Sequence, residues 1–122
     1  MKVLFALAIL ALIPVSTFAA DGPIRHVVHF KFKPDTEKSQ IEKVVSEFAA
    51  LKKKISVIDA LEWGTNVSPE GLDKGFTHCW IVTFKTAKDR DAYLVHADHK
   101  KFVDLLKPIL AEAFVIDFVP QG

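Results

Sequence analysis

The sequence predicts one α+β domain with a four-stranded antiparallel sheet, built in the order strand, helix, strand, strand, helix, strand. Apolar residues alternate with other residues in four short segments, as they do in strands that bury one side. Between the first and second segments, and again between the third and fourth, apolar residues recur at the spacing of amphipathic helices. This order of elements is the split arrangement of ferredoxin-like folds.

The first half of the domain begins with a strand over residues 25–33, whose even-numbered positions are apolar or histidine. Pro34 ends this strand because it cannot continue the ladder of hydrogen bonds. An amphipathic helix follows and ends near Lys54. It begins either at Asp35 or at Ser39, where a capping box with the glutamate three residues later is possible.

The second half contains the remaining strands and the second helical region. Alternation predicts strands over residues 60–67, 76–85 and 113–119. Helical spacing covers residues 86–96 and resumes at residue 98, and Pro108 is expected to kink or end that second stretch.

The two faces of the sheet are assigned by the character of alternate residues. The even-numbered residues of the first, third and last strands, including Phe114, Ile116 and Phe118, are expected to face the helices. The opposite face would then carry an apolar patch made of Val27, Cys79, Ile81, Val115 and Val119. A small monomer rarely leaves such a patch in water. We therefore expect a homodimer in which two copies pack their sheets face to face.

Residues 1–19 are expected to be a signal peptide. A lysine precedes an apolar run over residues 3–12, and Thr17 and Ala19 are the small residues that cleavage requires. The run is shorter than the ~20 apolar residues that span a bilayer. The mature domain is thus expected over residues 20–122, secreted or periplasmic and without membrane attachment after cleavage.

Charge and cysteine content exclude several classes of partner and bond. The chain has 16 Lys and Arg against 15 Asp and Glu, so it lacks the basic surface that nucleic acid or anionic membranes require. Its one cysteine, Cys79, cannot form a disulfide within the chain.

Motifs for common cofactors and nucleophiles are absent from the sequence. It has no glycine-rich phosphate loop, no serine nucleophile elbow and no paired carboxylates. His96 and His99 form an H-x-x-H pair, to which His78 could add a third ligand, but a zinc site needs three or four converging ligands. We expect neither a metal nor another cofactor.

Four strings of residues, in this order and spacing, carry a resemblance to a known family. They are Arg25-His-Val-Val-His-Phe-Lys-Phe-Lys33, Glu62-Trp-Gly-Thr-Asn66, Gly75-Phe-Thr-His78 and Tyr93-Leu-Val-His-Ala-Asp-His99. Together they resemble the stress-responsive dimeric α+β barrel (Dabb) family, over about residues 24–120. The resemblance implies a homodimer joined through its sheets.

The same resemblance implies a candidate catalytic pair. Many family members have no assigned activity, while a plant branch closes polyketide chains into aromatic rings with a tyrosine and a histidine. By motif these two residues fall on Tyr93 and His99. Family members often have proline where this chain has Ala97. Related dimeric α+β barrels also include monooxygenases, which is an analogy of fold alone.

Two histidines on the helix-facing side indicate a pocket between sheet and helices. Imidazoles among apolar residues need hydrogen-bond partners or a hydrated cavity. The expected lining, with the apolar and aromatic character of a small-molecule site, is His26, Val28, Phe30, Phe48, His78, Trp80 and Phe102. The alternative is a solid core in which each histidine bonds to a backbone carbonyl.

Tyr93 and His99 can share a site only if the helix breaks between them, because six residues at ~100° each place them on different helix faces. Asp98 is a suitable N-cap for a new helix, which would put His99 in the first turn. The positive end of the helix dipole there disfavours the imidazolium. A neutral His99 can then act as a base while the Tyr93 hydroxyl holds a carbonyl oxygen.

Three functions follow from these observations. The first is an exported protein of this family, of unassigned activity, that binds a small apolar or aromatic molecule in the pocket. The second is a polyketide-cyclase-like or other acid/base enzyme that uses Tyr93 and His99. The third is a non-catalytic, stress-associated dimer, which is favoured if Phe48, Phe102 and Trp80 fill the space between helices and sheet.

Overall fold

The computed structural model describes residues 22–122, so the expected signal peptide, residues 1–19, lies outside the described residues. Four strands form one antiparallel sheet in the order β2-β3-β1-β4. The strands are β1 (Ile24–Phe32), β2 (Ala60–Thr65), β3 (His78–Phe84) and β4 (Leu110–Phe118). The predicted α+β, ferredoxin-like arrangement is confirmed.

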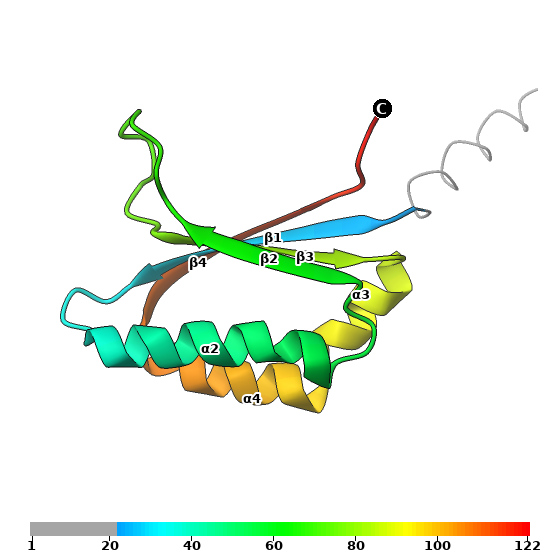
Figure 1. Cartoon of the computed structure of the whole chain (residues 1–122), viewed down its shortest axis with the longest axis horizontal. Helices are drawn as coiled ribbons and strands as arrows, with labels where there is room; N and C mark the ends of the chain where they lie inside the picture. Colours follow the sequence, from blue (N-terminus) through cyan, green and yellow to red (C-terminus); the bar gives the residue numbers. More distant parts are fainter. Residues whose placement is uncertain (1–21) are drawn as a thin grey trace, which may run out of the picture.

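Helices cover one face of this sheet. They are α2 (Lys38–Lys54), α3 (Ala87–Leu94), α4 (Ala97–Leu106) and the short 3₁₀ helix η1 (Lys107–Ile109). Figure 1 shows α2 and α4 side by side along the sheet, with α3 near one end. Within residues 22–122 none of the helices has the length and apolar character needed to cross a membrane.

Helix ends follow local sequence signals, with one difference from the prediction. The capping box of α2 joins Glu37 to Gln40, whose side-chain oxygen accepts from the Glu37 N–H at 3.0 Å. The pair predicted from Ser39 therefore lies inside the helix. At the other end of the helical region α4 stops before Pro108, which lies in η1, as expected for a residue that cannot donate a backbone hydrogen bond.

Large aromatic rings fill the space between the middle of the sheet and helices α2 and α4. Phe48 of α2 stacks on Trp80 of β3, with ring centroids 3.9 Å apart, and Phe102 of α4 lies 4.8 Å from Phe48. Exposure of these side chains is 2% for Phe48, 0% for Trp80 and 5% for Phe102. Burying a large apolar side chain stabilises the fold by ~1.5–3 kcal/mol, so this stack is a principal source of stability.

The strand β4 presents the opposite face from the one predicted. Phe114, Ile116 and Phe118 pair with His29, Val27 and Arg25 of β1. Directly paired residues share a face of an antiparallel sheet, so these three lie on the open side, each about half exposed. The prediction that they face the helices is wrong. Both sides of this strand carry apolar residues, and pairing with β1 selects the side.

The predicted face of the odd-numbered residues near the end of the chain is therefore also wrong. Val115 pairs with Val28 and Asp117 pairs with His26, so both lie on the helix-facing side. Val119, also predicted on the open face, packs against the core. The open face is nevertheless apolar, because β4 contributes its aromatic side chains there.

Candidate functional site

Tyr93, His99 and His26 meet at one end of the helix-covered face. Tyr93 belongs to α3 and is 1% exposed, and its ring lies 4.4 Å from that of His99 in α4, centroid to centroid. The ring of His26, from β1, meets Tyr93 edge-on at 5.9 Å. His26, which is distant in the sequence, therefore converges with the neighbouring Tyr93 and His99 on one place.

A break between α3 and α4 produces this convergence. The first helix ends at Leu94 and the second begins at Ala97, so the chain turns between Tyr93 and His99. The N-cap of α4 is His96, whose Nδ1 accepts the Asp98 backbone N–H at 3.0 Å. The helical break is confirmed. The prediction that Asp98 is the N-cap is wrong, because the helix begins before it, but His99 still lies in the first turn.

His99 is held in a form suited to accept a proton. Its Nδ1 lies 3.2 Å from the backbone oxygen of Leu94, to which it donates. In a neutral imidazole the other nitrogen, Nε2, then carries the free lone pair. Burial lowers the pKa of His99, the Leu94 carbonyl opposes this in part, and the charges of His26 and His96 lower it further. These surroundings favour the neutral form of the His99 imidazole.

Tyr93 has the complementary character of a hydrogen-bond donor. Its side chain is buried against His26, His99 and Phe84, whose ring lies 5.1 Å away. Burial raises the pKa of the Tyr93 phenol, because a phenolate would be poorly solvated there. The hydroxyl thus keeps its proton and can donate it in a hydrogen bond to a carbonyl oxygen.

Behind His26 lies an ion-pair network that the sequence did not predict. His26 Nδ1 is 2.7 Å from Asp117 Oδ1 on β4, and Arg90 Nη1 on α3 donates to Asp117 Oδ2 at 2.7 Å. Arg90 Nε also donates to Asp91, at 2.8 Å. Hydrogen bonds to Asp117 and Asp91 raise the pKa of Arg90, which keeps its charge.

His78 lies at the opposite end of β3 from Phe84 and takes no part in this cluster. Its Nδ1 is 2.8 Å from the Thr77 hydroxyl, and its ring stacks on Trp63 of β2 at 6.2 Å. The two rings line a groove of about 640 Å³ against α2. Burial lowers the pKa of His78.

The apolar residues expected to line a pocket are core residues in this structure. Val28, Phe30, Phe48, Trp80 and Phe102 are all buried in one cluster. They line neither the groove beside His78 nor the larger cavity on the open face of the sheet. Trp80 Nε1 is buried and, within residues 22–122, has no hydrogen-bond partner. The middle of the helix-covered face is therefore solid, and its functional groups lie toward the ends.

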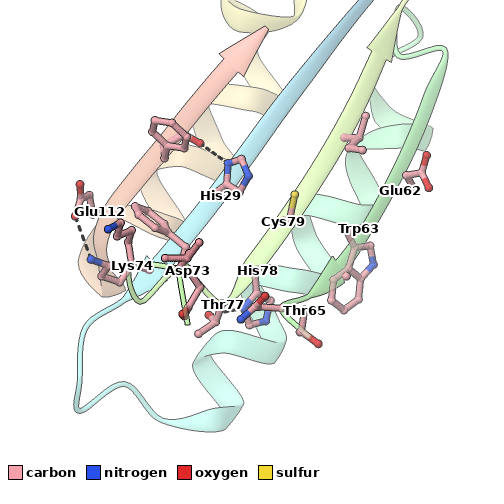
Figure 2. Close-up of a pocket in the computed structure, with 17 residues that line it drawn as sticks. His29, Glu62, Trp63, Thr65, Asp73, Lys74, Thr77, His78, Cys79 and Glu112 are labelled. Carbon is pink, nitrogen blue, oxygen red and sulfur yellow. Dashed lines mark hydrogen bonds and ion pairs between the residues drawn. The ribbon is translucent and has the colours of Figure 1, made fainter. Parts of the chain in front are cut away.

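The larger cavity, of about 800 Å³, lies on the open face of the sheet (Figure 2). His29 and Cys79 project from neighbouring strands in its floor, and Lys31 and Glu112 form an ion pair of 3.3 Å at its edge. The loop before β3 brings Phe76 under Lys31, whose Nζ lies 4.8 Å from the ring centroid. Burial raises the pKa of the Cys79 thiol, which makes it a poor nucleophile.

Metal-ligating side chains do not gather in the part of the chain that the structure describes. In residues 22–122 no group of three or more His, Cys, Asp or Glu could hold a metal ion. His78, the conceivable third partner of His96 and His99, belongs to the other end of the sheet.

Comparison with known proteins agrees with this architecture. A family model described as the stress responsive A/B barrel domain matches residues 24–120. The Arabidopsis thaliana stress-response A/B barrel domain-containing protein HS1 is 33% identical over 103 residues, which are 84% of this chain and 94% of that protein. Olivetolic acid cyclase from Cannabis sativa is 24% identical over 98 residues, covering 80% and 97%.

Solved structures show the same fold. A crystal structure of At3g17210 from Arabidopsis thaliana superposes with a TM-score of 0.77 at 30% identity, covering 81% of this chain and 96% of that one. A protein from Bacteroides fragilis, described as dimeric with a ferredoxin-like fold, superposes with a TM-score of 0.67 at 25% identity, covering 83% and 99%. The chain belongs to the stress-responsive A/B barrel domain family.

Proposed function

We propose that this protein is an acid/base enzyme that removes a proton from a small apolar or aromatic ketone bound beside Tyr93 and His99. The observation that carries the proposal is the contact between these two rings, at 4.4 Å, with His99 Nδ1 committed to the Leu94 carbonyl. His99 Nε2 is thereby left as the base. A positioned side chain of this kind accelerates proton transfer by about 10²–10⁴-fold.

In this mechanism the two side chains act on adjacent atoms of the substrate. His99 takes a proton from the carbon next to the carbonyl group, and the Tyr93 hydroxyl donates a hydrogen bond to the carbonyl oxygen, where negative charge develops. Phe84, beside Tyr93, makes the surroundings apolar, which favours an apolar substrate and strengthens the hydrogen bond. The proposed substrate site thus lies between the sheet and helices α3 and α4.

Two further observations support an enzyme over a purely structural role. The family resemblance implies a catalytic tyrosine and histidine at Tyr93 and His99, and one relative of this chain is named a cyclase. In addition, Tyr93, His99 and His26 are grouped at one end of the fold, whereas a core filled with aliphatic side chains would be simpler to stabilise. A functional role explains why these polar rings are grouped together, whereas a purely structural role does not.

Solvent exchange of a simple ketone tests the proposal even though the natural substrate is unidentified. 2-Tetralone, a small aromatic ketone with exchangeable hydrogens next to its carbonyl group, is incubated with the purified protein in D₂O, and loss of those hydrogens is followed by proton NMR. We expect exchange above the buffer rate that requires His99. Exchange at the buffer rate alone would instead favour the non-catalytic dimer.

We also propose that two copies associate through the open sheet face. Phe114, Ile116 and Phe118 are each about half exposed on that face, and Val27 and Ile81 lie beside them. Structural relatives described as dimeric support this arrangement. Light scattering at micromolar concentration is expected to give the mass of a dimer, and Ile116→Lys to give a monomer. A monomeric parent protein would contradict the proposal.

We further propose that the domain acts after export, in a secreted or periplasmic compartment. The support is the sequence of residues 1–19, with its apolar run and small residues before Ala20. Amino-terminal sequencing of the protein from a cell that expresses it should begin at Ala20. A protein that retains Met1 would contradict export with cleavage.

A further inference from the structure

His26 has the surroundings of a group that transfers protons rather than of a residue that only lines the site. It is 7% exposed, and among residues 22–122 its side-chain hydrogen bond is the one from Nδ1 to Asp117. The carboxylate fixes a proton on Nδ1, so Nε2 is the nitrogen available to a ligand. Tyr93 and Phe84 meet the ring of His26 edge-on.

We propose that His26, positioned by Asp117 and Arg90, is a second proton-transfer group of the site, which donates a proton to the carbonyl oxygen while His99 removes one from the adjacent carbon. This inference rests on the proposed function and deepens it. It names the reaction class as enolisation, in which one proton is removed and another is delivered.

The network holds the carboxylate of Asp117 by both oxygens. Oδ1 lies 2.7 Å from His26 and Oδ2 accepts from Arg90 at 2.7 Å, while Arg90 is also tied to Asp91. Bonds of this length between charged partners are stronger than neutral ones. The residues that form these bonds come from β1, β4 and α3, so the orientation of His26 depends on three elements rather than on its own strand alone.

The two imidazoles of the site differ in the groups that face them. A protonated His26 would form an ion pair with Asp117, whereas His99 faces the Leu94 carbonyl and no carboxylate. The other titratable groups near His26 are Arg90 and Tyr93 of α3, and β3 contributes the apolar Val82 and Phe84. The two imidazoles therefore have different partners, a carboxylate for His26 and a backbone carbonyl for His99, which suits them to different roles in one proton transfer.

The proposed step is balanced in protons and electrons. The C–H bond next to the carbonyl breaks, its proton goes to His99 Nε2, and its electron pair forms the C=C bond of the enol. His26 enters the step doubly protonated, with one proton on Nδ1 toward Asp117 and the other on Nε2. The carbonyl π pair takes the Nε2 proton, which leaves His26 neutral, so the substrate is isomerised and nothing is oxidised or reduced. Proton return from His99 to His26 through solvent restores the starting state.

The pH dependence of 2-tetralone exchange distinguishes this role from a structural one. With an acid and a base the rate constant is expected to rise and then fall with pH. In His26→Gln we expect exchange at neutral pH to drop by about 10-fold, less than for a lone acid/base group because Tyr93 remains, and the falling limb to disappear. Asp117→Asn should lower the rate in the parent protein but change nothing further in His26→Gln.

A matched variant and a second measurement control for loss of structure. Asp104→Asn makes the same chemical change on an exposed carboxylate of α4 and should leave the profile unchanged. Independently of activity, ¹⁵N NMR of the imidazole should show that the neutral form of His26 keeps its proton on Nδ1. Asp117→Leu should move that proton to Nε2 in a protein whose other resonances show that it is folded.

Each outcome bears on the inference. Exchange that needs His99 but keeps its rate and pH profile in His26→Gln would overturn the inference and leave the proposed function standing. The absence of exchange in the parent protein would overturn both. A neutral His26 with its proton on Nε2 and none on Nδ1 would contradict the positioning by Asp117 whatever the activity.

Discussion

The two ends of the helix-covered face each contain a histidine, and the difference between them shows what makes a site. His26 and His78 lie on the same side of the sheet among aromatic rings, on the neighbouring strands β1 and β3. His26 is bound to a carboxylate and meets Tyr93, which in turn contacts His99. His78 has a threonine hydroxyl and the face of Trp63. The neighbouring elements, not the strand position, determine the chemistry available to each histidine.

Between the two ends lies a packed stack of rings that keeps them apart. Phe48, Trp80 and Phe102 occupy the space in which a central pocket would otherwise join His78 to the Tyr93 cluster. Because this middle is solid, changes at one end are expected to have little effect at the other. Substitutions in the middle and at each end can test that separation.

Truncating the middle of the stack should produce the largest loss of stability. Trp80→Ala removes a fully buried ring that stacks on Phe48, and a change of this kind costs ~3–5 kcal/mol. Urea unfolding measures the change in the free energy of unfolding. A cost below about 1 kcal/mol would mean that the middle is an open pocket rather than a filled core.

Removing the proposed base should produce the largest loss of activity. His99→Gln is expected to lower 2-tetralone exchange by about 100-fold, because glutamine cannot accept the proton. The matched change at the other end, His78→Gln, should alter the rate by less than about 2-fold, since His78 lies outside the cluster. Equal losses in the two variants would contradict the separation of the two ends.

Removing the hydroxyl of Tyr93 should have a smaller effect. Tyr93→Phe keeps the buried ring and its contact with His99 but deletes the donor to the carbonyl oxygen. We expect a loss of about 10-fold in exchange, the scale of one hydrogen bond to developing charge. An unchanged rate at an unchanged fold would remove Tyr93 from the mechanism.

Mild acid should lower the free energy of unfolding by a smaller amount than these substitutions do. The decrease comes from His99 at one end of the helix-covered face and His78 at the other. Burial lowers the pKa of His99 and of His78 below the value of about 6.5 that each has in the unfolded chain. As pH falls from about 6.5 toward the folded-state pKa values, the unfolded chain binds more protons, so the free energy of unfolding decreases. Urea unfolding at pH 7.5 and 5.5 should show the decrease, and His99→Gln should reduce it.

The sequence patterns were sufficient to predict the order of elements, and the resemblance to a known family implied the pairing of Tyr93 with His99. Alternation and helical spacing identify the strands and helices, and the short motif requires a helical break that the structure contains. Both residues lie in one local segment, so no long-range register was needed to bring them together.

Asp117 could not be predicted because its place depends on long-range register. Its strand carries apolar residues on both sides, and only the pairing with β1 decides which side faces the helices. The two residues that this pairing brings together, His26 and Asp117, are 91 positions apart in the sequence. Arg90 was missed for the same reason, since its partner was assigned to the other face. Likewise Phe48, Trp80 and Phe102 have a composition that suits either a filled core or a pocket wall, and only their packing distinguishes the two.

The protonation state of His99 tests the central claim most directly. A pH titration of the imidazole ¹⁵N resonances, assigned with His99→Gln, measures both its charge and the nitrogen that carries its proton. We predict a neutral ring at pH 7, with the proton on Nδ1 toward Leu94 and a midpoint below about 6.5. A His99 that is charged at pH 7, or neutral with its proton on Nε2, would contradict its role as the base.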